Sequence, residues 1–217
     1  MKLKKLRTKD DSYTFFNPDI DDYYHSTFGA VQESQFIYVD NGFKYINKKE
    51  IKLLEVGFGT GLNAILTFRE SDKRKIKTIY HGLEILPIDY KDICLLNYHV
   101  NPGYKQEIIK IIHESPWEEE IFISNNILKK INSDIQNYST EEKYDLIYFD
   151  AFASEKQENI WTYRIFQNMF NILNPGGILI TYSVKGIVKR GLKEAGFIIK
   201  RLPGPPGKRH ILRATKS

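Results

Sequence analysis

Three glycines at alternate positions, Gly57, Gly59 and Gly61, follow an apolar run that contains the acid Glu55. Glycine lets the backbone approach a ligand closely and take positive φ values. The G-x-G-x-G spacing differs from the G-x-G-x-x-G of dinucleotide sites and from the phosphate-binding G-x-x-x-x-G-K-[ST] loop. A carboxylate beside this loop would repel a pyrophosphate. Glu55 therefore predicts a ligand that carries a cation.

Two further acids fall where strands are expected to end. Glu84 lies 23 residues after Gly61 (84 − 61) and is placed to accept hydrogen bonds from both hydroxyls of a ribose, as acids do in dinucleotide folds. Asp150 closes the segment KYDLIYFD, where a carboxylate would hydrogen-bond an attacking amine and help remove its proton. The alternative for Asp150 is an N-cap role. The alternative for the three glycines is a turn that merely joins a strand to a helix.

These residues fit a chain in which buried strands alternate with amphipathic helices. Strands are expected over 51–57, 76–84, 143–150 and 176–183, and helices over 61–70, 87–100, 160–173 and 185–196. This alternation predicts an α/β protein with a mainly parallel sheet covered on both faces. Such sheets bind ligands beyond the carboxyl ends of their strands, where the glycines and both acids are expected to meet.

Other segments are expected to form antiparallel pairs. Residues 34–46, SQFIYVDNGFKYI, place an Asn-Gly turn between two alternating runs, which predicts a hairpin. Residues 197–202 and 209–215 are expected to pair as the final strands around the segment PGPPG. The region 101–143 is the least regular, and 122–135 within it is interpreted as a hairpin or short strand pair.

Length and composition indicate a single domain over residues 1–217, with an N-terminal β extension at 1–50 and an α/β core at 51–217. No apolar run approaches the roughly 20 residues of a membrane span, and the basic N-terminus lacks the apolar stretch of a secretory signal. The one cysteine excludes an internal disulfide, and the five histidines show no metal-ligand spacing. We therefore expect a cytoplasmic protein with no membrane partner and no metal.

Basic residues are concentrated near the C-terminus. Residues 181–217 hold ten Lys or Arg and one acid, a net charge of +9, so residues 1–180 carry −4 of the total of +5. Such a face suits a polyanion, most commonly a nucleic acid, although a solvated surface is the alternative. Candidates for phosphate contacts, which would position a nucleic acid without reading its sequence, are Lys185, Lys189, Arg190, Lys208 and Arg209.

The segment EVGFGTGLN, residues 55–63, resembles the first motif of S-adenosyl-L-methionine (SAM)-dependent methyltransferases. The resemblance implies a Rossmann-like class I fold, with a mostly parallel seven-stranded sheet and, in this chain, an N-terminal β-hairpin extension. It also implies SAM as the cofactor, bound by the core at 51–217. The cofactor-binding residues that it implies are Glu55, Gly57, Phe58, Gly59, Gly61, Asn63 and Glu84.

Blocks along nearly the whole chain resemble a more specific family, the tRNA methyltransferases that make 5-methylaminomethyl-2-thiouridine at the wobble position. DAFASEKQENIW, residues 150–161, is similar to the family signature D-[GA]-F-[AS]-P-x-K-[NQ]-P-[ED]-[ML]-W. Residues 21–39, 82–87, 182–197 and 204–212 resemble further blocks in the same order. The segment NSDI resembles the block whose acid reads the adenine amino group, which implies that cofactor-binding role for Asp134.

This resemblance implies N-methylation of 5-aminomethyl-(2-thio)uridine in tRNA, with Asp150 at the amine. The family forms the methyltransferase half of a bifunctional enzyme and also occurs as standalone versions. No flavin-binding fingerprint follows, and 217 residues leave no room for an FAD domain, so a precursor oxidase would be a separate partner. Ser154, Glu158 and Asn159 depart from the signature, which loosens the loop after Asp150.

Two aromatic residues are candidates for the substrate side. Tyr24 would cover the cofactor if the N-terminal hairpin folds across the cleft, together with Ser26 and Gln32–Glu33. The alternative is that these are ordinary strand and turn residues. Phe152 would stack on the wobble base, because a base must leave its stack to be modified. Trp161 lies at helical spacing from Ile165, which favours a place in the core.

Two other functions stay open at this point. The first is another transferase on the same fold, either a small-amine methyltransferase or an aminopropyltransferase. The basic C-terminal segment argues against it, since polyamine substrates are cations. The second is a non-catalytic RNA-binding module, against which the full set of acids argues. Salt-sensitive tRNA binding without cofactor binding would support that module.

Overall fold

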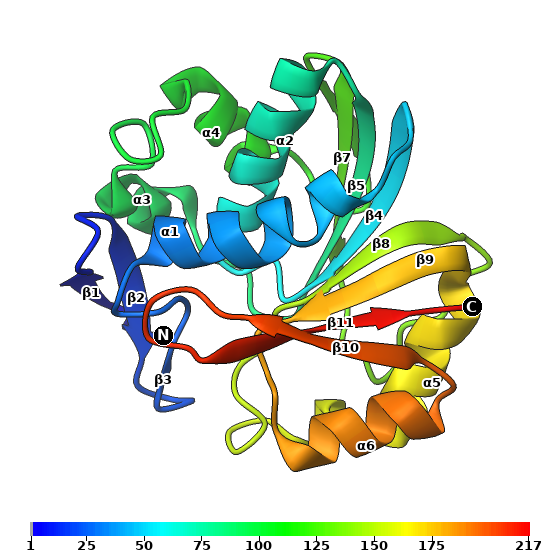
Figure 1. Ribbon diagram of the computed structural model, residues 1–217. Helices are drawn as coiled ribbons and strands as arrows, with labels where there is room; N and C mark the ends of the chain where they lie inside the picture. The colour runs from blue at the N-terminus through cyan, green and yellow to red at the C-terminus, as the bar shows by residue number, and fades with distance from the viewer. Residues whose placement is uncertain (1) are drawn as a thin grey trace.

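The computed structural model describes residues 2–217 and centres on an eight-stranded sheet of order β10-β11-β9-β8-β4-β5-β7-β6 (Figure 1). Five strands run parallel, namely β4, β5, β7, β8 and β9, whereas β6, β10 and β11 pair antiparallel with their neighbours. The strands are β4 (Glu50–Val56), β5 (Lys77–Glu84), β6 (Glu120–Ile123), β7 (Asn126–Asn132), β8 (Tyr144–Phe149), β9 (Leu173–Thr181), β10 (Ile198–Pro203) and β11 (His210–Thr215). The expected α/β fold class is confirmed.

The sheet has one strand more than the seven expected. The additional strand is β6, which turns back on β7 at one edge of the sheet, and Ser124 in the connection has a φ of 54°. This confirms the strand pair predicted within 122–135. At the other edge, β10 and β11 pair antiparallel from Ile198↔Thr215 to Pro203↔His210, as predicted around PGPPG.

The N-terminal segment forms a separate three-stranded antiparallel sheet of β1 (Lys4–Arg7), β2 (Tyr13–Asn17) and β3 (Asp22–Tyr23). The hairpin predicted at 34–46 is wrong. There, α1 (Ala30–Ser34) continues into a π-helical segment, Gln35–Asp40, and a 3-10 turn follows at Phe43–Tyr45. A two-residue type I′ turn needs positive φ at both central residues, but Asn41 and Gly42 have φ values of −97° and −107°.

Burial explains why this segment is helical. Three consecutive residues, Ile37, Tyr38 and Val39, are all buried. Their side chains therefore do not alternate between a solvent-exposed and a buried face, as those of a hairpin strand would. Asn41 ends the helical segment, because its side-chain amide and its backbone N–H both donate to the carbonyl of Phe36. Packing against the sheet therefore overrides the strand propensity of this aromatic and β-branched stretch.

Helices cover both faces of the large sheet (Figure 1). One face carries α1, α2 (Leu62–Arg74) and α4 (Gln106–Glu114), and the other carries α5 (Tyr163–Ile172) and α6 (Gly186–Glu194). The helix expected over 87–100 is reduced to α3 (Tyr90–Ile93) and a 3-10 turn, Cys94–Leu96, whereas α4 was not predicted. Within residues 2–217, no helix combines the length and the apolar character needed to span a membrane.

The register of the parallel strands brings the predicted residues to one edge. Val56 of β4 lies opposite Leu83 of β5 and Phe149 of β8. The residues that directly follow these three are Gly57, Glu84 and Asp150. They therefore occupy neighbouring positions at the carboxyl ends of the strands. The expected meeting point of the glycine loop and both acids is confirmed.

Candidate functional site

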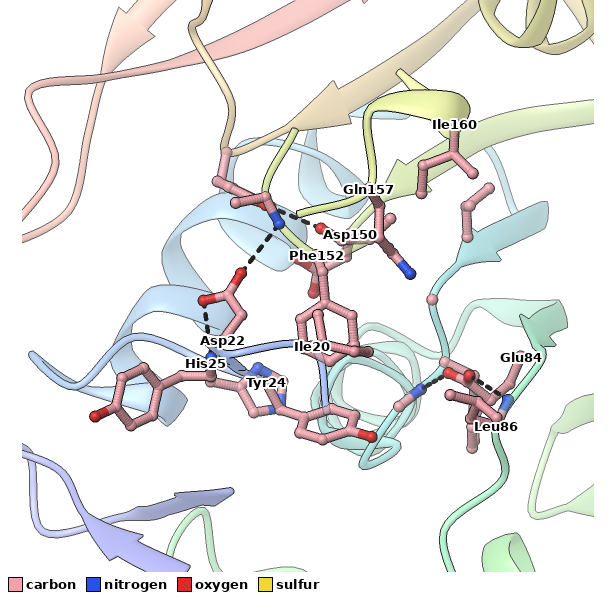
Figure 2. Close-up of a pocket in the computed structure, with 18 of the residues that line it drawn as sticks. Ile20, Asp22, Tyr24, His25, Glu84, Leu86, Asp150, Phe152, Gln157 and Ile160 are labelled. Carbon is pink, nitrogen blue, oxygen red and sulfur yellow. Dashed lines mark hydrogen bonds between the residues drawn. The ribbon is translucent and has the colours of Figure 1, made fainter. Parts of the chain in front are cut away.

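A cavity of about 500 Å³ opens at this edge of the sheet. The loops after β4, β5 and β8 form its inner wall, and residues 20–28 of the N-terminal segment form its outer wall (Figure 2). Oδ2 of Asp22 accepts a hydrogen bond from the backbone N–H of Ala153, at 3.1 Å. Nε2 of His25 lies 2.6 Å from Oγ1 of Thr60. The outer wall is thus bonded to the loop after β8 and to the glycine loop.

The glycine loop lies against two other segments. Gly57 has a φ of 89°, and a Cβ there would come within 2.7 Å of the carbonyl oxygen of Asp150. Gly59 has a φ of 49°, and a Cβ there would lie 3.1 Å from the ring of Tyr24. Gly57, Phe58 and Gly59 line the cavity, whereas Gly61 precedes α2 in a left-handed conformation and does not line it.

Glu84 lines the cavity and organises the loops around it. Its Oε2 accepts a hydrogen bond from the N–H of Gly59 at 2.8 Å, and its Oε1 accepts from the N–H groups of Ile85 and Leu86 (Figure 2). Burial raises the pKa of the Glu84 carboxyl, although these three N–H groups oppose that effect. Both lone-pair positions of Oε1 are thus taken, whereas Oε2 keeps one for a further donor, such as a ribose hydroxyl.

Asp134 also lines the cavity, on the loop after β7. Its Oδ1 accepts the backbone N–H of Gln136, and its Oδ2 accepts the side-chain amide of the same residue, both at 2.9 Å. The carboxylate is therefore oriented by its own loop. Its position next to Ile135 offers an acceptor and an apolar surface together, which suits the edge and face of a base.

Glu55 departs from the prediction of direct contact with the ligand. It is fully buried and is not among the residues that line the cavity. Its Oε1 accepts from the side-chain amide of Asn63 at 2.7 Å, and its Oε2 accepts from the hydroxyl of Tyr80 at 2.6 Å. Burial raises the pKa of its carboxyl well above the usual range. The side chain points below the loop because alternate residues of a strand face opposite sides of the sheet.

Asp150 lines the cavity at the end of β8. The hydroxyl of Tyr38 donates to its Oδ1 at 2.6 Å, and Nδ2 of Asn63 donates to its Oδ2 at 2.7 Å. Burial raises the pKa of the Asp150 carboxyl to about 7, with these two donors and Lys208 opposing that rise. Asn63 was predicted to bind the cofactor, but it does not line the cavity and instead joins Asp150 to Glu55.

Aromatic rings form part of the cavity wall, and the ring of Tyr24 lies against the glycine loop. Tyr24 and Phe152 both line the cavity, and their rings meet edge to face with centroids 4.9 Å apart (Figure 2). Trp161 is fully buried, and its Nε1 donates to the carbonyl of Phe152 at 2.9 Å. Trp161 therefore belongs to the core, as predicted, and it fixes the backbone that carries Phe152.

The five predicted phosphate-contact residues are only partly brought together. Lys208 lines the cavity, 3.3 Å from Glu33 and with its Nζ 5.1 Å from the centroid of the Tyr182 ring. Lys185 pairs with Glu155 of the loop after β8. Neither Lys185 nor the remaining three residues line the cavity. Lys189 and Arg190 lie on α6, and Arg209 lies on the turn between β10 and β11.

Sequence reasoning missed part of this site. Tyr38 lies in the segment that was wrongly predicted as a hairpin. His25 and Asp22 lie in the block at 21–39 that resembles the family, but neither was assigned a role at the site. No local pattern marks a buried tyrosine that contacts an acid 112 positions later. The density of polar and aromatic residues over 21–26, DDYYHS, is the signal that could have pointed to the outer wall.

A family model described as S-adenosyl-L-methionine-dependent methyltransferase matches residues 106–217, more than half of the chain. The chain belongs to this family. The predicted enzyme class and cofactor are thereby confirmed. The family model matches the loop with Asp134, the strand that ends at Asp150 and the C-terminal strands, whereas the glycine loop lies before the matched residues.

Curated relatives extend the similarity across the chain. It is 26% identical over 219 residues to the "tRNA 5-methylaminomethyl-2-thiouridine biosynthesis bifunctional protein MnmC" of Pseudoalteromonas atlantica, covering 89% of this chain and 31% of that protein. The protein of the same name from Burkholderia multivorans is 26% identical over 95% of this chain and 34% of its own length. The chain thus spans about a third of the length of these relatives.

Solved structures share the fold. MNMC2 from Aquifex aeolicus superposes with a TM-score of 0.77 at 22% identity, over 100% of this chain and 70% of that one. Spermidine synthase from Thermotoga maritima superposes with a TM-score of 0.57 at 12% identity, over 100% of this chain and 72% of that one.

The residues present fit SAM. Gly57 and Gly59 line the cavity with backbone alone, and a Cβ at either position would press against Asp150 or Tyr24. Glu84 and Asp134 supply acceptors on two adjacent loops. The cavity volume of about 500 Å³ lies within the usual range for cofactor sites.

Proposed function

We propose that this protein transfers a methyl group from SAM to the primary amine of 5-aminomethyl-(2-thio)uridine at the wobble position of tRNA, forming 5-methylaminomethyl-(2-thio)uridine. The observation that carries the proposal is the carboxylate of Asp150, which lines the same cavity as the aromatic pair Tyr24 and Phe152. An acceptor for an amine and surfaces for a base are thus within one cavity. The name of the curated relatives supports tRNA as the substrate.

In this proposal, the loops after β4, β5 and β7 hold the cofactor. The backbone at Gly57, Phe58 and Gly59 would lie along its amino-acid part, Glu84 would accept the ribose hydroxyls, and Asp134 would accept the adenine amino group. Gly61 acts indirectly by starting α2, and Glu55 and Asn63 act from below the loop. SAM, when bound, supplies an electrophilic methyl group on a sulfonium.

Asp150 orients the amine and accepts its proton. Methyl transfer requires a neutral nitrogen whose lone pair points along the axis of the bond that breaks. An ionised Asp150 accepts an N–H of the amine and so fixes that direction. As the new C–N bond forms, the nitrogen becomes positively charged and releases a proton, which the carboxylate accepts and passes to solvent. A pKa of about 7 keeps Asp150 near the balance between both states.

In this proposal the substrate base, after it leaves the anticodon stack, lies against the contacting rings of Tyr24 and Phe152. The basic residues on α6 and on the β10–β11 turn would contact the phosphates around it. Lys208 is central to this placement, because it lies both at the cavity and on the basic segment. A tRNA substrate places the reaction in the cytoplasm.

A small polyamine is the second candidate substrate. Five carboxylates line the cavity, which suits a polycation: Asp22, Glu33, Glu84, Asp134 and Asp150. All five are already engaged by groups of the protein. Asp22, Glu84, Asp134 and Asp150 accept hydrogen bonds, and Glu33 pairs with Lys208. We therefore favour the tRNA amine and keep polyamine methylation or aminopropyl transfer as measurable alternatives.

The proposed reaction covers the methylation step alone. A precursor that carries a carboxymethyl group on the amine would first need oxidative removal of that group. We propose that an oxidase active site outside residues 1–217 supplies this step.

A transfer assay tests the proposal. The protein is mixed with methyl-labelled SAM and with tRNA from cells that accumulate aminomethyl-uridine, and the nucleosides are analysed. Label is expected in methylaminomethyl-uridine and is lost in Asp150→Ala. Parallel reactions contain spermidine or putrescine in place of tRNA. Label in the polyamines alone would replace the tRNA assignment, and salt-sensitive tRNA binding without SAM binding would indicate an RNA-binding module.

A further inference from the structure

The carboxylate of Asp150 is held from behind by two donors that belong to different elements. Tyr38 comes from the helical segment after α1, and Asn63 comes from the first turn of α2. Tyr38 donates to Oδ1 at 2.6 Å, and Asn63 donates to Oδ2 at 2.7 Å. Each oxygen therefore has one donor from the protein interior.

Neither donor faces the cavity. Tyr38 and Asn63 are each 1% exposed, and neither is among the residues that line the cavity. An ionised carboxylate offers about four lone-pair positions. Two of these are taken on the interior side, so the positions on the cavity side are those left for an incoming N–H. The plane of the carboxylate is set by the two interior bonds.

The orientation of Asn63 is itself determined by its neighbours. Its Nδ2 donates to Oδ2 of Asp150 and also to Oε1 of Glu55, both at 2.7 Å. Both partners are carboxylate oxygens, so an amide nitrogen, and not an amide oxygen, must face them. Oε2 of Glu55 is held in turn by the hydroxyl of Tyr80. Glu55 thus acts on the reacting acid through Asn63.

We propose that Tyr38 and Asn63 are positioning residues that aim the carboxylate of Asp150 at the attacking amine and stabilise its ionised form. The proposal rests on the function proposed above. It assigns a part of the catalytic site to the segment 35–40, which shares no element with the cofactor loops. It also gives Asn63 and the buried Glu55 a role other than contact with SAM.

Several charged or titratable groups face Asp150 and set the background for this effect. Lys208, on the β10–β11 turn, lowers the pKa of Asp150, and Glu33 of α1 raises it. Tyr182, after β9, has its own pKa raised, in part by the charge on Asp150. The hydroxyl of Tyr38 differs from these groups because it donates directly to the carboxylate. Its removal should therefore raise the pKa of Asp150 while the other groups stay in place.

The test is the pH profile of kcat/KM for methyl transfer to aminomethyl-uridine tRNA in wild type and Tyr38→Phe. We expect the acidic limb to move to higher pH by about one to two units, since a hydrogen bond to a charged group contributes about 1.5–3 kcal/mol and one pKa unit corresponds to about 1.36 kcal/mol. The pKa of the substrate amine is the same in both reactions and cannot produce this shift. The affinity for SAM should stay unchanged.

Tyr148→Phe is the matched control. Tyr148 is also fully buried, and its ring lies 5.1 Å from that of Tyr38, but its hydroxyl is bonded to Thr67. Its removal should leave the acidic limb where it is in wild type. Equal shifts in both variants, or a shift in neither, would overturn the positioning role of Tyr38.

Asn63→Ala separates the two roles considered for that residue. A positioning role predicts an acidic limb at higher pH and a lower kcat, with the Kd for SAM unchanged. A weakened Kd for SAM with an unshifted limb would return Asn63 to cofactor binding and remove it from this proposal. Tyr38→Phe keeps the shape of the core, so it carries the test even if Asn63→Ala does not fold.

Direct titration distinguishes this proposal from the proposed function. The carboxyl carbon of Asp150 is followed by NMR in protein labelled with carbon-13 aspartate, with Asp150→Asn for assignment. A higher titration midpoint in Tyr38→Phe than in wild type and Tyr148→Phe supports the effect of Tyr38, even if the tRNA assay fails. An unchanged midpoint overturns it, whatever the substrate is.

Discussion

Nε2 of His25 lies 2.6 Å from Oγ1 of Thr60, a hydrogen bond that joins the N-terminal segment to the middle of the glycine loop. Thr60 also accepts a hydrogen bond from the hydroxyl of Tyr98 at 2.7 Å, so its own proton is available to His25. Burial lowers the pKa of His25 to about 4, which keeps the ring neutral and able to accept that proton at pH 7. The outer wall of the cavity is thereby bonded to the loop that we propose holds the cofactor.

His25→Ala should weaken SAM binding without abolishing the fold. The loss of one buried hydrogen bond costs about 1–2 kcal/mol, which corresponds to a roughly 5- to 30-fold higher Kd. Calorimetry with SAM measures this directly. His99→Ala is the control, because the side chain of His99 is exposed. Equal affinities of the His25 variant and wild type would show that the outer wall does not support the loop.

Gly57→Ala should damage both stability and cofactor binding. The new Cβ would lie 2.7 Å from a backbone carbonyl at a φ of 89°, so the loop must move. Gly176→Ala serves as the control, since its φ of 76° is similarly positive but nothing lies within 4 Å of the added Cβ. We expect Gly176→Ala to cost only about 1 kcal/mol of strain and to bind SAM normally. The Kd of Gly57→Ala should rise at least about tenfold, or about 1.4 kcal/mol.

The fold was predictable where an apolar run is long enough to form a buried strand of a parallel sheet. The strand that ends at Glu84 and the strand that precedes Asp150 show this, because no residue in either of them is exposed. The segment 34–46 was not predictable from its own residues, because Ile37 and Tyr38 are buried by distant parts of the chain. The same holds for the site. The glycine spacing indicates a ligand-binding loop, but only the structure shows that the side chain of Glu55 is buried beneath that loop.

Glu84→Gln should weaken SAM binding by at least about tenfold, or about 1.4 kcal/mol. The amide nitrogen of glutamine would face an N–H donor, either that of Gly59 or those of Ile85 and Leu86, so one loop loses its acceptor. The ribose hydroxyls would lose an ionised acceptor as well. Calorimetry gives the Kd, and Glu120→Gln, on an exposed position of β6, is expected to match wild type. A normal Kd in Glu84→Gln would remove Glu84 from the cofactor site.

Asp150 should make the folded protein less stable as the pH rises. Its carboxyl has a pKa of about 7 in the folded state against an ordinary value of 3.8, so the folded state binds the proton more tightly. The resulting stabilisation is full below pH 3.8 and is lost as the pH rises through 7. Relative to Asp150→Ala, wild type should lose about 4 kcal/mol of unfolding free energy across this window.

Urea unfolding at several pH values from about 4 to about 8 measures that difference. Burial also raises the pKa values of Glu55 and Glu84, but both acids are present in both proteins. Only the part of the Glu55 shift that the charge of Asp150 causes differs between them. A constant difference between wild type and Asp150→Ala would mean that Asp150 stays ionised throughout. The acid would then accept a hydrogen bond from the amine without holding its proton.

The basic surface should govern tRNA affinity and its dependence on salt. Lys189 and Arg190 lie on α6, next to Lys185, whose pairing with Glu155 places this end of the helix beside the loop after β8. Lys189→Ala and Arg190→Ala should each raise the Kd for tRNA several-fold at moderate salt. Each should also reduce the slope of log K against log salt by about 0.7–0.9 for every phosphate that the variant no longer neutralises.

Lys110→Ala, on the exposed side of α4, is the control for this binding face. It removes the same positive charge from a helix that lies on the opposite face of the sheet from α6 (Figure 1). Its Kd for tRNA and its salt dependence should therefore match those of wild type. An equal effect of all three substitutions would indicate nonspecific attraction to the whole molecule, because a charge far from a defined face would then count as much as one within it.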